Sequence, residues 1–258
     1  AQLLAFRIPL DRGAPGAETL RQAVERAGVL ATMPAARATA LPADVKSSLL
    51  QLRAGLLSLL DGGAIAPIAP VSRRPPPPLR DAPPRGLRAE PPSLADAASP
   101  REAARTLLHQ TDAALSRLRL TQLASQPPDA TRAAAPGPNL LVEVPMLLGG
   151  ELAIAQLRVE RDGSRHERGA ARGWRMRFAV SFSAIGEVGA EVSLIGRTAS
   201  VLIWAGEDAT ADALEAMLPG LPPALAARGL AVGTVRVRRG APQPEASMAT
   251  GRLMDRVR

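Results

Sequence analysis

A change of hydrophobic period at Asn139 constrains the fold of this chain more than any other feature. From Asn139 to Gly240, apolar and polar residues alternate in short segments, as expected for strands that bury one face. The six segments are NLLVEVPML, ELAIAQLRVERD, GWRMRFAVSF, GEVGAEVSLIG, TASVLIWA and LAVGTVRVRRG. In the fifth segment both faces are apolar, so we expect it to be a central strand.

One helical pattern interrupts this series, between the fifth and sixth segments. In TADALEAMLPGLPPALAARG the leucines recur at helical spacing, with Thr210 as the expected cap. Three internal prolines predict a break near Gly220, because proline removes a backbone donor and clashes with the preceding turn. Residues 139–240 are therefore predicted to form an α+β domain, a small mixed or antiparallel sheet with a helix packed on it.

Charged residues occupy the polar faces of the third and fourth segments. Arg175 and Arg177 alternate with apolar residues in the third, and Glu187 and Glu191 do so in the fourth. If the two segments pair, these opposite charges lie across from each other on one face of the sheet. We expect ion pairs between them.

Helical segments precede this domain. Residues 1–66 contain two amphipathic patterns, AETLRQAVERAGVL and LPADVKSSLLQLRAGLLSLLDGG, and Asp44 or Pro42 marks the start of the second. Residues 101–126 continue a helix that begins at Pro100 and is capped by Ser99, with Glu102 completing a capping box. These helices need an apolar surface on which to pack.

Two further segments lack the pattern of a folded element. Residues 67–100 are rich in proline and are predicted to be a semi-rigid, disordered linker. Residues 241–258 have little apolar periodicity and are predicted to be a disordered tail.

The composition argues against an enzyme. There are no cysteines, so disulfides, thiolate metal sites and cysteine nucleophiles are excluded. The only histidines, His109 and His166, lack partners at metal-ligand spacing. No nucleophile elbow, phosphate-binding loop or dinucleotide-binding loop is present. We therefore predict no catalytic, cofactor-binding or metal-binding residues, and no cofactor.

The formal net charge of +8 raises the possibility of a nucleic-acid partner. The arginines are interleaved with acidic residues, as in RVERDGSRHER, so the local field is close to balanced and we do not expect nucleic-acid binding. No apolar run approaches the roughly 18 residues that span a bilayer. The first residues do not show the basic, apolar and small-residue pattern of a secretory signal peptide. We expect no stable membrane insertion, no cleaved signal peptide and a monomer.

The order of elements resembles the C-terminal domain of the flagellar hook-length control protein family. The resemblance runs over AIGEVGAEVSLIGRTASVLIWAGEDATADALEAMLPGLPPALAARGLAVG and is best over residues 174–240. Its residues are Ile185, Gly186, Val188, Ala213, Leu214, Leu218, Pro219, Leu221, Leu225, Gly229, Leu230, Val232 and Gly233. The sequence departs from the family where SFSA replaces a Pro-Glu pair before Ile185, and where Pro222 and Pro223 are added to the helix.

The resemblance implies a function that needs no catalyst. Members of the family are exported from the cytoplasm by the flagellar type III apparatus, and their N-terminal part and linker sense the length of the hook. Their C-terminal domain contacts the cytoplasmic domain of the export gate protein and switches export from hook to filament subunits. By this analogy the partners are the export gate protein and the hook and hook-cap subunits. The contact residues expected here are Gly186, Glu187, Val188 and Ala190.

Two other functions stay open at this point. The sheet domain could belong to a non-enzymatic interaction or scaffold protein with a different partner. The chain could also be a basic nucleic-acid binder, which predicts a steep salt dependence of its affinity for DNA.

Overall fold

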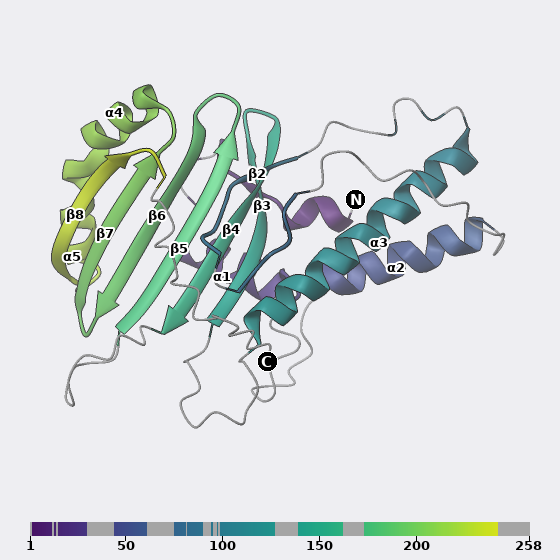
Figure 1. Cartoon of the computed structure of the whole chain (residues 1–258), viewed down its shortest axis with the longest axis horizontal. Coiled ribbons are helices and arrows are strands. Elements are labelled where there is room, and N and C mark those ends of the chain that lie inside the picture. The colour runs from purple at the N-terminus through teal and green to yellow at the C-terminus, as the bar shows by residue number, and fades with distance from the viewer. Residues whose placement is uncertain are drawn as a thin grey trace, which may run out of the picture.

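The structure is a computed structural model, and it shows helices arranged around a mixed sheet of eight strands (Figure 1). The predicted α+β class is thus confirmed. The described residues are 2–11, 13, 15–29, 44–60, 75–80, 82–89, 94, 97, 99–126, 139–161 and 173–241. His166 and residues 242–258 of the predicted tail lie outside them.

The six predicted strands all form, with ends within one residue of the prediction. β3 (Asn139–Leu148), β4 (Glu151–Arg161), β5 (Gly173–Phe182), β6 (Gly186–Ile195) and β7 (Thr198–Ala205) pair antiparallel in chain order. β8 (Ala231–Arg239) then pairs with β7 in parallel. β7 therefore has a neighbour on both sides, which confirms the prediction made from its two apolar faces.

The parallel connection from β7 to β8 contains the predicted broken helix. It consists of α4 (Asp208–Met217), a 3-10 turn η3 (Leu218–Gly220) and α5 (Leu221–Ala227). The break falls at Gly220, as the three prolines predict. The predicted cap is wrong, because the helix begins two residues before Thr210 with Glu207 at the N-cap position and no side-chain cap bond there.

Two long helices project side by side from the β3 edge of the sheet (Figure 1). They are α2 (Val45–Leu59) and α3 (Pro100–Ser125). Of the two candidate starts of α2, Asp44 is the one that caps the helix, and it accepts a hydrogen bond from Ser47 N at 2.6 Å. The predicted Ser99 cap of α3 is confirmed, because Ser99 Oγ accepts a hydrogen bond from Glu102 N at 3.2 Å. The apolar stripes of the two helices meet in a cluster made of Leu56, Leu60, Ala104 and Leu108.

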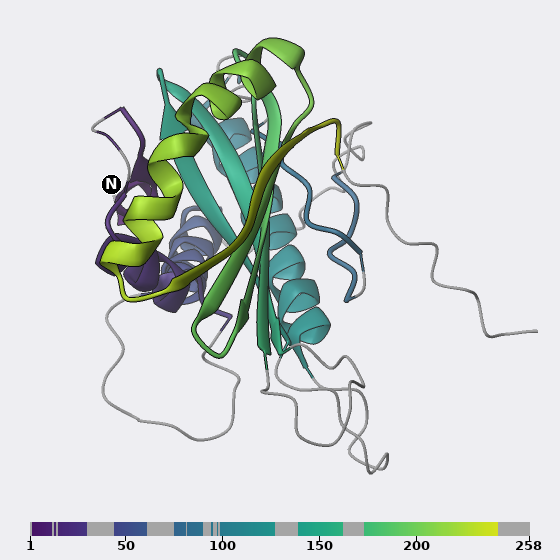
Figure 2. The ribbon, with the colours of Figure 1, turned by 90° about the vertical axis from the view of Figure 1, so that its left-hand side faces the viewer.

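The N-terminal residues are continuous with the sheet. They form η1 (Gln2–Phe6), β1 (Ile8–Pro9) and α1 (Ala17–Arg26), and β1 pairs in parallel with β3. Ile8 and Val29 share one buried cluster with Val142 and Val144 of β3. Figure 2 shows α1 on the same side of the sheet as α4 and α5. The start of the chain therefore contributes to the same core as the β-sheet.

Part of the proline-rich segment also lies on the sheet. We call residues 75–80 and 82–89 the strap. The strap includes β2 (Leu87–Arg88), which pairs with Ile154 and Ala153 of β4. The pairing of β4 with β5 stops just before this point, at Gln156 and Ala179, so β2 occupies the edge of β4 that β5 leaves open. Figure 2 shows the strap on the side of the sheet opposite α4 and α5.

Close backbone contact and buried polar groups hold the strap. A Cβ at Gly86 would lie 2.4 Å from Ser181 N, so only glycine fits there. Arg158 is 3% exposed and donates from Nη2 to the Leu79 carbonyl at 2.6 Å. The strap thus supplies a hydrogen-bond acceptor to the buried guanidinium of Arg158. Burial of a charge without such partners is costly.

Candidate partner-binding surface

The turn before β6 determines the position of the predicted contact residues. Gly186 is the first residue of β6 and has a φ of +70°. A Cβ at this position would also lie 2.6 Å from Glu207 Cγ. Both the backbone conformation and the close approach of Glu207 therefore require glycine.

Two hydrogen bonds fix this turn to the start of α4. Thr210 Oγ1 donates to the Ile185 carbonyl at 2.9 Å, and Gly206 N donates to the Glu187 carbonyl at 2.8 Å. Thr210 thus binds the turn before β6 instead of capping its own helix. The start of β6 and the start of α4 form one rigid corner of the molecule.

The four predicted contact residues differ in how far a partner can reach them. Gly186 is buried, and Ala190 is only 3% exposed because it lies between Phe178 and Ile203. Glu187 and Val188 are half-buried. A protein that binds this corner would therefore touch Glu187 and Val188, while Gly186 and Ala190 set the shape beneath them.

Val188 and Glu187 face opposite sides of the sheet. Val188 pairs with Val180 on β5 and with Ala205 on β7, so its side chain lies on the same face as theirs. The neighbouring strand β8 has Arg239 in register with Ala205, and Arg239 forms an ion pair with Asp212 of α4. Val188 therefore lies on the face of the sheet that α4 covers.

Glu187 lies on the opposite face, towards the strap. Burial raises the pKa of its carboxyl above the usual value, and the charge of Arg85 in the strap partly offsets this effect. Folding therefore shifts the protonation equilibrium of Glu187 towards its neutral form, relative to the unfolded chain.

The other predicted charges on that face form a network. Arg177 Nε lies 2.8 Å from Glu191 Oε2, and Arg175 Nε lies 3.5 Å from Glu191 Oε1. The predicted cross-strand pairing is thus confirmed for Glu191. It does not form for Glu187, because the register places Glu187 opposite Ser181.

Sequence reasoning missed a contact that shapes the same strand. The ring of Trp204 on β7 lies over Gly189 on β6, and a Cβ at Gly189 would be 2.2 Å from Trp204 Cζ2. Trp204 is 4% exposed, and Trp and Gly at this spacing become partners only once β6 and β7 are aligned. No local pattern in the sequence signals this pair.

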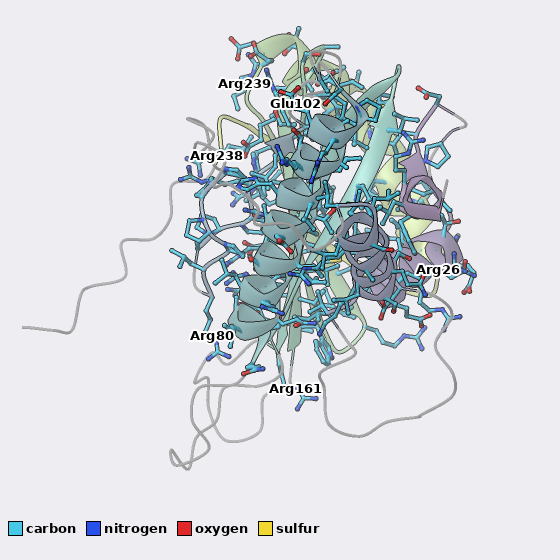
Figure 3. All side chains as sticks on the ribbon, turned by 90° about the vertical axis from the view of Figure 1, so that its right-hand side faces the viewer. Arg26, Arg80, Glu102, Arg161, Arg238 and Arg239 are labelled. Atoms are coloured by element: carbon cyan, nitrogen blue, oxygen red, sulfur yellow. The ribbon has the colours of Figure 1, made fainter. Side chains whose placement is uncertain are left out.

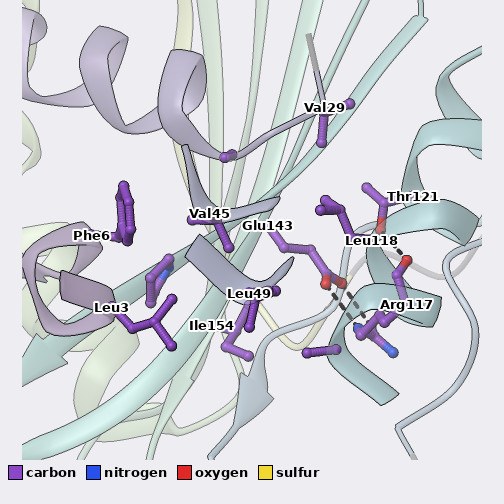
Figure 4. Close-up of a pocket in the computed structure, with 13 residues that line it drawn as sticks. Leu3, Phe6, Val29, Val45, Leu49, Arg117, Leu118, Thr121, Glu143 and Ile154 are labelled. Atoms are coloured by element: carbon purple, nitrogen blue, oxygen red, sulfur yellow. Dashed lines mark hydrogen bonds and ion pairs between the residues drawn. The ribbon is translucent and has the colours of Figure 1, made fainter. Parts of the chain in front are cut away.

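A cavity of about 230 Å³ lies where the N-terminal residues and the two long helices meet the sheet (Figure 4). Its walls are mainly apolar side chains, among them Leu3, Phe6, Leu49 and Ile154. Arg117 and Glu143 pair at 2.7 Å beside it. At this place the packing of the described residues of η1, α2 and α3 against the sheet is therefore less complete than a close-packed interior.

Arginines lie at several places around the molecule. Figure 3 shows Arg26 on α1, Arg80 on the strap, Arg161 at the end of β4, and Arg238 and Arg239 on β8, at separate places. Within the described residues, no group of three or more His, Asp or Glu is placed to hold a metal ion. No helix in the described part of the chain has the length and apolar character to cross a membrane.

These features describe a class of domain: a sheet backed by a broken helix, with a rigid, shaped corner at the start of β6. Within that class, residues 164–246 match the family model of the flagellar hook-length control protein FliK. The matched range contains all of β5, β6, β7, α4, α5 and β8. The resemblance predicted over residues 174–240 is confirmed, and this part of the chain is a domain of that family. Searches of curated proteins and of solved structures each found no match.

Proposed function

We propose that this chain is an exported flagellar hook-length control protein whose C-terminal domain switches type III export from hook to filament subunits. The observation that carries the proposal is the coincidence of the family match with one structural unit, β5 to β8 with the broken helix between β7 and β8. A role in flagellar hook-length control follows from the family. The switch itself is the finer step that we propose.

In this proposal the domain acts by shape rather than by chemistry. The cytoplasmic domain of the export gate protein binds the corner at the start of β6, with Val188 and Glu187 in contact. The bonds from Thr210 to Ile185 and from Gly206 to Glu187 hold this corner in one conformation before binding. Preorganisation of this kind reduces the entropy lost on association.

Length sensing requires the N-terminal part to leave the sheet. Residues 1–136 fully extended would span on the order of 450 Å at about 3.3 Å per residue. In the folded chain the described residues of this part are held by the short strand β1, by the strap and by helices that border a cavity. We propose that these contacts separate during export through the flagellum, where the chain passes the hook and hook-cap subunits.

The proposal is tested by measuring hook length by electron microscopy in the bacterium that encodes the chain. Wild type is compared with Val188→Asp and with a deletion of residues 174–240. Long hooks with few filaments are expected for both, from proteins that are still expressed and exported. Ile195→Asp is the matched control, because Ile195 is 53% exposed at the opposite end of the same strand; it should give normal hooks.

Two results would contradict the proposal at different levels. Normal hooks from the strain that lacks residues 174–240 would refute the role in hook-length control and leave a scaffold protein with another partner as the better account. Long hooks from the deletion strain, with normal hooks from Val188→Asp, would keep the function but move the contact away from this corner.

A further inference from the structure

The outer edge of β8 is a sheet edge to which the proposed function assigns no role. Among the described residues, β8 pairs only with β7, and no strand lies along its other side. β8 has nine residues, longer than an average strand. An exposed edge of this length presents unpaired backbone donors and acceptors to any extended segment.

A bulge divides this edge into two parts. The register between β7 and β8 shifts between Ala199 and Val201, and Thr234 N donates to Ser200 Oγ at 3.3 Å. The extra residue disrupts the ladder near Gly233, which hinders pairing there. After the bulge, five residues from Val235 to Arg239 are in regular register with Val201 to Ala205.

The backbone direction within these five residues follows from one hydrogen bond. Gly240 N donates to the Ala205 carbonyl at 2.8 Å. Successive residues of a strand direct their backbone groups to alternate sides, so Arg236 and Arg238 bond towards β7. The N–H and C=O groups of Val235, Val237 and Arg239 therefore point away from the sheet.

The side chains of the same residues specify what could pair there. Val235 and Val237 are half-buried on the face that α4 and α5 cover. Arg236 and Arg238 are exposed on the opposite face, and neither forms an ion pair with any described residue. An added strand would thus meet an apolar surface on one face and two positive charges on the other.

We propose that Val235–Arg239 binds an extended protein segment by strand addition. In this segment, acidic and β-branched residues alternate. The acidic side chains lie beside Arg236 and Arg238, and the apolar ones lie beside Val235 and Val237. Backbone hydrogen bonds supply affinity, and the charges select the partner. This inference deepens the proposed function by naming the chemistry of one partner. It rests on the proposed function only in placing that partner at the flagellar export apparatus.

The edge and the corner at β6 lie at the same end of the domain. Val188 is in register with Ala205, which is in register with Arg239. Two strand spacings separate Val188 from Arg239, about 10 Å. One partner protein can therefore contact both surfaces at once.

The test uses the full chain and a synthetic peptide, acetyl-Val-Glu-Val-Glu-Val-Glu-Val-amide, with the lysine analogue as its opposite. Affinity is measured by isothermal titration calorimetry. The acidic peptide should bind to the wild type. The double variant Arg236→Glu with Arg238→Glu should bind the acidic peptide at least about tenfold more weakly and should gain affinity for the lysine peptide. Arg101→Glu with Arg119→Glu, an equal charge change at exposed positions on α3, should leave binding unchanged.

Amide hydrogen exchange separates strand addition from simple charge attraction. On binding, the N–H groups of Val235, Val237 and Arg239 should become protected, while those of Arg236 and Arg238 are protected already. A milder pair, Arg236→Gln with Arg238→Gln, repeats the measurement if the reversed charges disturb folding.

Three outcomes would overturn the inference. The first is equal affinity for the acidic and lysine peptides, and the second is binding without new protection at the three amides. The third is protection of these amides in the absence of peptide that disappears when the protein is diluted. That third result would assign the edge to a second copy of the chain. Because the peptide experiment does not involve the flagellum, it can fail while the hook-length experiment succeeds, so the two failures are distinguishable.

Discussion

At the scale of single residues, the contact between Gly189 and Trp204 leaves no room for any residue other than glycine at position 189. An added methyl at Gly189 would overlap the Trp204 ring at 2.2 Å and the Phe178 carbonyl at 2.6 Å. We predict that Gly189→Ala lowers the free energy of unfolding by about 2 kcal/mol, as overpacked sites do. Gly55→Ala is the control, because Gly55 is exposed in α2 with open space around it; it should raise stability by about 0.5–1 kcal/mol. Urea unfolding measures both, and equal stabilities would contradict the packing.

The half-buried carboxyl of Glu187 predicts a pH dependence of stability, also at the scale of a single residue. Its pKa is raised in the folded chain, so its contribution to stability is complete below the unfolded pKa and is lost as pH rises through the folded pKa. Glu187→Gln removes this loss. The variant should be more stable than wild type at pH 7, and the difference should shrink as pH falls towards the pKa of an unfolded glutamate. A constant difference in urea unfolding across that range would refute the assignment.

At the scale of elements, we expect the strap to be separable from the sheet it crosses. Gly86→Ala places a methyl against the backbone of Val180 and Ser181, which cannot move without breaking β5. We predict that this change releases the strap and leaves β5 and β6 folded. The amide of Ala89, which donates to the Leu152 carbonyl at 3.2 Å, should then exchange much faster, while amides of β6 remain protected. Unchanged exchange at Ala89, or loss of protection throughout the sheet, would contradict this.

The elements that the sequence predicted are those whose pattern is long and local. β5 and β7 have the predicted bounds because alternation runs along their whole length, and the helix breaks at Gly220 because proline acts on its own turn. β1 and β2 have two residues each, too few to show a period, and their partners are distant in sequence. The same limit applies to the predicted contact set: burial of Ala190 depends on both neighbouring strands, which single-strand patterns do not reveal.

At the scale of the whole molecule, the family domain is joined to the rest of the chain through the seam between β4 and β5. The matched residues begin after β4, and before Gln156 the edge of β4 is occupied by β2 instead of β5. The strap and the N-terminal elements therefore contact the domain at a place where its own pairing is incomplete. In our account, removal of these contacts during export leaves the corner at β6 intact, because Thr210 and Gly206 hold it from within the domain.

The most direct test of the proposed switch is binding of the full chain to the purified cytoplasmic domain of the export gate protein, measured by calorimetry. Val188→Thr replaces a methyl with a hydroxyl and keeps the shape of the side chain. Ile195→Thr introduces the same hydroxyl, with the loss of one further carbon, at the exposed far end of β6. With the fold of each variant verified by circular dichroism, the account predicts that wild type and Ile195→Thr bind alike and that Val188→Thr binds several-fold more weakly. Equal binding by all three, or no binding by the wild type, would contradict it.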